Sequence, residues 1–138
     1  RQNGTSTMTL VGEGDRAVYA LGPDAVLKVD RGSGQNDGEV EAWNAAPPRM
    51  RAHFARILDY TRDRQLLVQE RADRGATRRE ADALWRRVDA ADWACNDYRP
   101  ENVGVFGGTV KMIDYESCGP KRFMRDWKLQ KWRGSGPQ

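Results

Sequence analysis

Several common classes of protein are excluded by what this sequence has little of. It holds one histidine and two cysteines among 138 residues, and no apolar run approaches the roughly 20 residues that a membrane-spanning helix needs. No signal-peptide pattern opens the chain, so we expect a cytoplasmic protein. Because the single histidine, His53, has no cluster of further histidines or cysteines to support it, it is expected to be a structural loop residue and not a metal ligand.

The two cysteines, Cys95 and Cys118, follow no metal-binding or redox spacing. We therefore expect reduced thiols, and a single disulfide between them is the alternative that the sequence leaves open.

A strong charge of one sign is also missing. The 23 lysines and arginines are scattered among 20 acidic residues, and the formal net charge is +3. Nucleic-acid binding favours a basic face that is segregated from the acids, so nucleic acid is not the expected partner. Residues 120–132 mix aromatic and basic residues and predict a terminal amphipathic helix that packs over the core, with membrane-surface or nucleic-acid binding as weaker alternatives.

The most informative stretch lies late in the chain. Residues 95–103 read Cys-Asn-Asp-Tyr-Arg-Pro-Glu-Asn-Val, and residues 110–116 read Val-Lys-Met-Ile-Asp-Tyr-Glu. The β-prone residues on either side of Gly107-Gly108 predict a tight hairpin, since both turn positions can take positive φ. Counting outward from this turn pairs Val103 with Met112.

This register has a chemical consequence at the open end of the hairpin. Asn102 is expected beside Asp114, with Asp97 just upstream in the chain. An amide oxygen and a carboxylate placed side by side are ligands suited to a hard cation such as Mg²⁺.

The remaining segments predict a mixed α and β architecture. Three strands are expected over 8–11, 17–21 and 25–30, and a further strand pair over 54–60 and 65–70. A helix is expected over 39–46, capped by Asn36 or Asp37 and ended by Pro47-Pro48.

A second helix is expected from Thr77 to about Trp93. Thr77 and Glu80 match a capping box, and apolar residues follow at helical spacing.

In this order, the features resemble the protein-kinase-like superfamily over about residues 11–116. The residues that carry the resemblance are a Gly-rich loop (Gly12, Glu13, Gly14, Asp15, Arg16, Ala17), Lys28 on the third strand, Glu39 on the first helix, a hinge segment (Glu70, Arg71, Ala72), a catalytic loop (Asp97 to Asn102) and a second metal motif (Ile113 to Glu116). The resemblance implies an α+β, protein-kinase-like fold in a single domain. A five-stranded antiparallel sheet with one helix would fill residues 8–70, and a strongly minimised helical lobe with the catalytic loop and hairpin would fill residues 71–138.

The resemblance also implies an ATP- and Mg²⁺-dependent phosphotransferase. The Gly-rich loop would cover the nucleotide phosphates, Lys28 would bind them while held by Glu39, and the hinge would contact adenine. Asp114 and Asn102 would bind Mg²⁺. Asp97 would accept the proton of the attacking hydroxyl, and Arg99 would steady the transferring phosphoryl group.

The acceptor and even the presence of catalysis stay open at this point. A protein serine or threonine is the first expectation, because the sequence from Asp97 to Asn102 is close to that of the catalytic loop in protein kinases. Glu116 replaces a glycine of the metal motif, which is more similar to aminoglycoside and choline phosphotransferases and favours a small-molecule hydroxyl. Cys95-Asn96 replaces the usual His-Arg, which favours a pseudokinase that acts as an interaction or inhibitor module.

Overall fold

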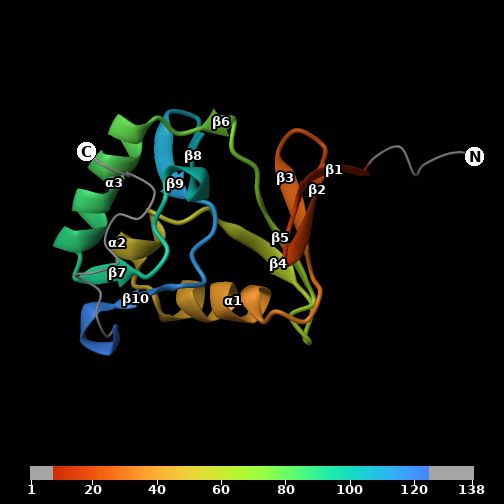
Figure 1. Ribbon diagram of the computed structural model, residues 1–138, viewed down its shortest axis with the longest axis horizontal. Helices are drawn as coiled ribbons and strands as arrows, with labels where there is room; N and C mark the ends of the chain where they lie inside the picture. The colour runs from red at the N-terminus through yellow and green to blue at the C-terminus, as the bar shows by residue number, and fades with distance from the viewer. Residues whose placement is uncertain (1–7, 125–138) are drawn as a thin grey trace, which may run out of the picture.

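The structure is a computed structural model that describes residues 8–124. Figure 1 shows a sheet at one end of the molecule, α3 at the other, and α1 running between them. In chain order the elements are β1 (Met8–Glu13), β2 (Arg16–Leu21), β3 (Ala25–Asp30), α1 (Gln35–Ala45), α2 (Pro48–Arg51), β4 (Ile57–Tyr60), β5 (Leu66–Glu70), β6 (Arg74–Gly75), α3 (Arg78–Ala90), β7 (Trp93–Cys95), the 3₁₀ helix η2 (Pro100–Asn102), β8 (Val103–Phe106), β9 (Thr109–Met112), β10 (Cys118–Pro120) and the 3₁₀ helix η3 (Lys121–Phe123).

The largest sheet confirms the predicted class of fold, a mixed α and β protein with a five-stranded antiparallel sheet. Its strand order is β1-β2-β3-β5-β4, and every neighbouring pair is antiparallel. Along β3 the side chains of Val26, Lys28 and Asp30 are buried, whereas those of the alternate residues are only partly buried. Because side chains alternate across a strand, this pattern places Lys28 on the covered face of the sheet.

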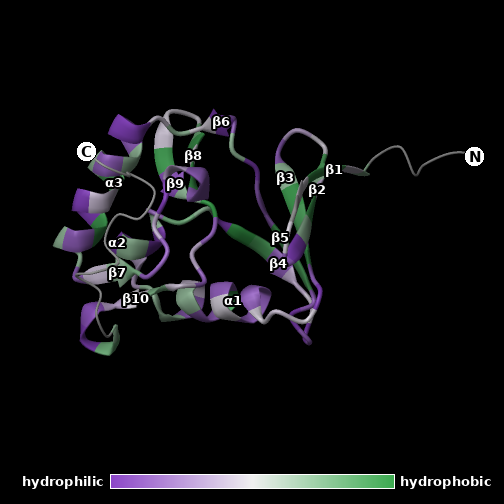
Figure 2. Cartoon of the chain, in the orientation of Figure 1, coloured by the Kyte–Doolittle hydropathy of each residue, from purple (hydrophilic) through white to green (hydrophobic). Residues whose placement is uncertain are grey.

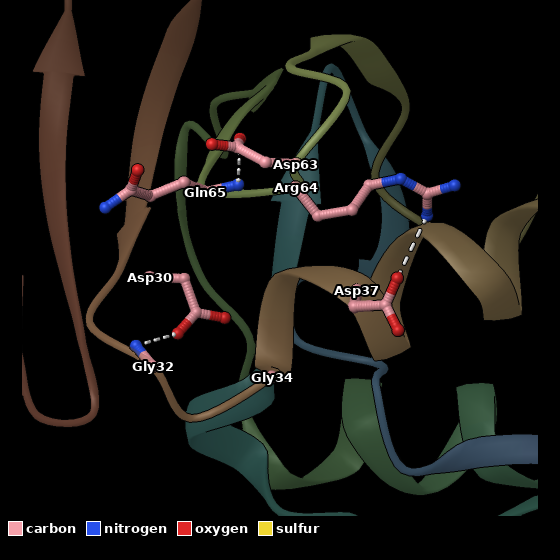
Figure 3. Close-up of a pocket in the computed structure, with 7 residues that line it drawn as sticks. All are labelled: Asp30, Gly32, Gly34, Asp37, Asp63, Arg64 and Gln65. Atoms are coloured by element: carbon pink, nitrogen blue, oxygen red, sulfur yellow. Dashed lines mark hydrogen bonds and ion pairs between the residues drawn. The ribbon is translucent and has the colours of Figure 1, made fainter.

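The start of α1 differs from the predicted one. The helix begins at Gln35, so Asn36 and Asp37 lie in its first turn and do not cap it. Asp30, at the end of β3, does the work of a cap: its carboxylate accepts the backbone N–H of Asn36 at 2.9 Å and that of Gly32 at 2.9 Å. Figure 3 shows Asp30 below the chain of Gln65, and Asp37 turned outward to Arg64. The end of the helix, ahead of Pro47-Pro48, is as predicted.

The predicted hairpin is confirmed in its register. β8 pairs with β9 so that Val103 lies opposite Met112, and Gly107 and Gly108 have φ values of 54° and 86°. β6 adds a third strand on the side of β8. The approach is close there, because a β-carbon at Gly104 would lie 2.6 Å from that of Ala72.

The capping box of α3 is also confirmed. The Thr77 side chain accepts the N–H of Glu80, and the Glu80 carboxylate accepts the N–H of Thr77. The helix ends at Ala90, earlier than predicted. Asp92 takes a φ of 63° and turns the chain, so that Trp93 begins β7 instead of ending the helix. In Figure 2 the helix carries hydrophilic residues along its length with apolar positions between them, and its buried residues are Ala81, Leu84 and Val88.

The predicted terminal helix over 120–132 falls largely outside the described residues. Within residues 8–124, η3 spans Lys121–Phe123. In the same part of the chain, no helix combines the length and the apolar character that crossing a bilayer requires.

The expectation of reduced thiols is wrong in this structure, in which Cys95 and Cys118 form a disulfide. The two residues are direct partners in the antiparallel pair of β7 and β10, and both are buried. Their spacing in sequence carried no signal because the bridge depends on this strand pairing, which joins short segments on either side of the hairpin.

Reduction of the disulfide is expected to lower the free energy of unfolding by about 3 kcal/mol, because the bridge closes a loop across a sequence separation of 23 residues. Urea unfolding of the wild-type protein with and without reductant measures this change. The Cys95→Ala/Cys118→Ala double variant is the control, and reductant should leave its midpoint unchanged. Two titratable thiols in the wild-type protein before reduction, together with an unfolding midpoint that reductant does not change, would contradict the bridge.

Candidate functional site

A buried lysine lies at the centre of the site. Lys28 is 1% exposed, and its ammonium donates to Glu39 at 3.0 Å, to Asp114 at 2.9 Å and to the carbonyl oxygen of Ile113 at 2.8 Å. These partners come from α1 and from the segment that follows β9. An ammonium has three donors, and all three are used here.

Glu39 is the acidic partner from α1, and it is fully buried. One carboxylate oxygen accepts from Lys28 and from Arg16, the latter at 2.7 Å. The other accepts the backbone N–H of Tyr115 at 2.8 Å. The carboxylate therefore ties β2, β3 and the segment after β9 to one point on α1.

Arg16 contributes its side chain to the site, which the sequence did not predict. It was expected to contribute to a phosphate-covering loop through the backbone, but its side chain is 5% exposed and turns inward. Its guanidinium donates to Asn36 at 2.9 Å and to Asp114 at 2.8 Å. The signal available in the sequence was strand alternation, which puts Arg16 on the same face of β2 as the buried Ala20.

Asp114 and Glu116 complete an acidic cluster with Glu39. Oxygen atoms of these three carboxylates lie within 4.8 Å of one another. Burial acts to raise the pKa of Asp114, but Lys28 and Arg16 outweigh it and hold that pKa below its ordinary value. Burial, reinforced by the charge of Glu39, raises the pKa of Glu116 to about 7. Carboxylates grouped in this way have the oxygen donors that Mg²⁺ takes in proteins.

Tyr115 holds this cluster in place. Its ring is fully buried and stacks on Phe54 with centroids 4.0 Å apart, and its hydroxyl donates to the carbonyl oxygen of Ala55 at 2.7 Å. With its backbone N–H bonded to Glu39, the residue between Asp114 and Glu116 is fixed at both ends. This explains how two short acidic side chains keep their positions in an irregular segment.

Asn102 lies opposite Ile113, the residue before Asp114, as the register of the hairpin predicts. Its carbonyl oxygen accepts the N–H of Ile113 at 2.7 Å, and its side-chain amide donates to the carbonyl oxygen of Asp97 at 3.0 Å. The second bond fixes the orientation of the amide, so that its oxygen points away from the Asp97 carbonyl.

Asp97 lies at the surface and is paired with Arg99. The guanidinium donates to both carboxylate oxygens at 2.9 Å. The loop itself is anchored from below, because the Asp97 N–H donates to the Ser117 hydroxyl at 3.2 Å and the Tyr98 hydroxyl donates to the carbonyl oxygen of Ala81 in α3.

The remaining expected residues surround the lysine less closely. Residues 12–17 include the turn between β1 and β2, with Gly14 and Asp15 exposed. In the hinge segment, the Glu70 N–H donates to the carbonyl oxygen of Arg56 and the Arg71 N–H to that of Asp24, both at 2.9 Å.

His53 lies in the turn between α2 and β4. It is partly buried, and its carbonyl oxygen accepts the N–H of Met112 at 2.8 Å.

In comparisons with known proteins, no family model and no curated protein matches the chain.

Proposed function

We propose that this protein is an ATP- and Mg²⁺-dependent phosphotransferase with a protein-kinase-like core, and that it transfers the γ-phosphate of ATP to a hydroxyl of a protein serine or threonine. The observation that carries the proposal is the position of Lys28. One buried ammonium contacts Glu39 of a helix and Asp114 of a distant segment at 3.0 and 2.9 Å. A nucleotide site needs a fixed positive charge beside a metal-binding carboxylate, and this arrangement provides both.

The nucleotide would be bound by elements on the two sides of Lys28. The backbone of residues 12–17 would cover the phosphates, and Lys28 would neutralise part of their charge. Adenine would contact the hinge segment of Glu70, Arg71 and Ala72. Because the N–H groups of Glu70 and Arg71 are already bonded inside the protein, the expected base contact is through Ala72.

The donor set fits a magnesium ion. Asp114 would be its principal ligand and Asn102 a second, because carboxylate and amide oxygens are donors that Mg²⁺ accepts. When bound, the ion would neutralise charge that develops on the phosphate oxygens.

Asp97 would act as the base. The acceptor hydroxyl would transfer its proton to an Asp97 carboxylate oxygen as its own oxygen attacks the γ-phosphorus. The bond from the γ-phosphorus to the bridging oxygen would break at the same time, and ADP would leave with that oxygen. Arg99 lies against that carboxylate, so it would have to shift toward the transferred phosphoryl group for the hydroxyl to approach. In that position its charge would stabilise the transition state.

Two other functions have specific support. The pairing of both Asp97 oxygens with Arg99 favours a nucleotide-binding or partner-binding pseudokinase in which the base is not presented. Glu116, the last residue of the second metal motif, favours a small-molecule acceptor.

Mg²⁺ and ATP together are expected to raise the melting temperature. At a ligand concentration 100 times Kd the gain is about 2.7 kcal/mol, or roughly 10 °C for a chain of this size. In Asp114→Asn the part of the shift that requires Mg²⁺ should disappear, because the metal ligand is lost. Thermal unfolding with ATP alone and with Mg²⁺ plus ATP separates the two parts.

Asp59→Asn is the matched control, since Asp59 is an exposed aspartate on β4. It should keep the full shift. An Mg²⁺-dependent shift of equal size in Asp114→Asn would remove the metal assignment, and the absence of any shift in the wild-type protein would remove the proposed function.

A further inference from the structure

Arg16 lies where a cation is expected in the acidic cluster. One guanidinium nitrogen is 2.8 Å from Asp114 and 3.6 Å from Glu116, and the other is 2.7 Å from Glu39. All three carboxylates that share the candidate metal site therefore contact this one side chain. Only 5% of it is exposed, so these are buried ion pairs and not surface contacts.

The guanidinium is held by more than charge. It donates to the side-chain oxygen of Asn36, which is fully buried. The nitrogen of the same amide donates to the carbonyl oxygens of Lys28 and Gln65 at 3.0 Å. The planar fork of arginine suits several acceptors at once, which an ammonium does less well. The acceptors around Arg16 therefore match the geometry of a guanidinium.

Two of the three carboxylate charges in the cluster are already offset without a metal ion. Lys28 and Arg16 carry two positive charges against Glu39, Asp114 and Glu116. Within this group, Glu39 and Asp114 each accept from both cations through a single oxygen. A divalent ion bound among the same carboxylates would lie within a few ångströms of the guanidinium, where repulsion between like charges is strong.

We propose that Arg16 is the resident cation of this site, and that it prevents the carboxylates from holding a divalent ion until nucleotide phosphates supply compensating negative charge and further ligands. The protein would then bind metal and nucleotide together and would not keep a metal ion on its own. The dependence on nucleotide rests on the proposed function, whereas the exclusion of free metal rests on the geometry of Arg16 alone.

Binding of Mn²⁺ to the nucleotide-free protein tests the exclusion, with electron paramagnetic resonance to count free and bound ion. Arg16→Gln removes the charge and keeps a hydrogen-bonding side chain, and we expect it to bind Mn²⁺ at least about tenfold more tightly than the wild-type protein. Arg64→Gln is the control, because Arg64 pairs with Asp37 and Glu41 away from the site. It should bind like the wild-type protein.

A measurement on the wild-type protein covers the case in which Arg16→Gln does not fold. In protein labelled with ¹⁵N-arginine, Mn²⁺ alone should leave the Arg16 guanidinium signals sharp, and Mn²⁺ with ATP should broaden them. Broadening by Mn²⁺ alone, or an Arg16→Gln variant that binds Mn²⁺ no more tightly than the wild-type protein, would overturn the proposal. If Arg16→Gln gains Mn²⁺ affinity but no variant binds ATP, the exclusion by Arg16 is supported and the proposed function fails.

Discussion

Glu39→Gln is expected to lower the free energy of unfolding by about 3 to 5 kcal/mol, the range observed when one partner of a buried ion pair is removed. Lys28 and Arg16 both depend on the same Glu39 oxygen, at 3.0 and 2.7 Å, and both side chains are almost completely buried. A neutral amide would leave two buried positive charges that share Asp114, with Glu116 as a more distant partner of Arg16 at 3.6 Å. Since the stability of most domains is only 5 to 15 kcal/mol, the loss would be a large part of the total.

A second glutamate on the same helix gives a matched control. Glu41 lies on α1 two residues from Glu39, but its side chain is 66% exposed and its contact with Arg64 is 3.4 Å long. Glu41→Gln should change the stability by less than about 1 kcal/mol, as exposed ion pairs do. Urea unfolding of both variants makes the comparison. Equal losses in the two would show that the buried network does not stabilise the fold.

Asp97→Ala is expected to reduce phosphoryl transfer by a factor of about 10² to 10⁴, the usual contribution of a general base. Its effect on folding should be small, because within residues 8–124 the carboxylate accepts its side-chain hydrogen bonds from the exposed Arg99. The Mg²⁺-ATP shift in melting temperature should therefore persist. Transfer is measured with radiolabelled ATP and two sets of acceptors, one of proteins and one of small molecules that carry hydroxyl groups.

Glu101→Ala is the control within the same loop, since Glu101 is exposed. Its transfer rate should equal that of the wild-type protein. Persistent transfer in Asp97→Ala would mean that another group acts as the base. Nucleotide binding without transfer in the wild-type protein would favour the pseudokinase. Transfer to small molecules alone would show that the acceptor is a small-molecule hydroxyl and not a protein side chain.

The parts of the structure that could be predicted are those set by neighbours in the chain. Gly107 and Gly108 fixed the turn of the hairpin, and counting from them placed Val103 opposite Met112, as the structure has it. Thr77 and Glu80 marked the start of α3 because a capping box is a contact across one helical turn.

The parts that could not be predicted depend on contacts between distant segments. Asp30 caps α1 from the preceding strand because the intervening loop folds back over its carboxylate. Arg16 reaches Asp114 across 98 residues of sequence, and strand alternation indicates its face of β2 but not this partner. The Lys28 and Glu39 pair was expected from a family resemblance and lies where that resemblance puts it, although the resemblance itself stays a proposal.

The disulfide has a topological consequence for the candidate site. It joins a residue two positions before Asp97 to one two positions after Glu116, so the proposed base, both proposed metal ligands and the hairpin between them belong to one covalent macrocycle. Within this ring, the peptide bond at the exposed turn of Gly107 and Gly108 is not the sole connection between the two strands. Cleavage there would give two chains joined by the disulfide and leave both halves of the site attached to the same molecule.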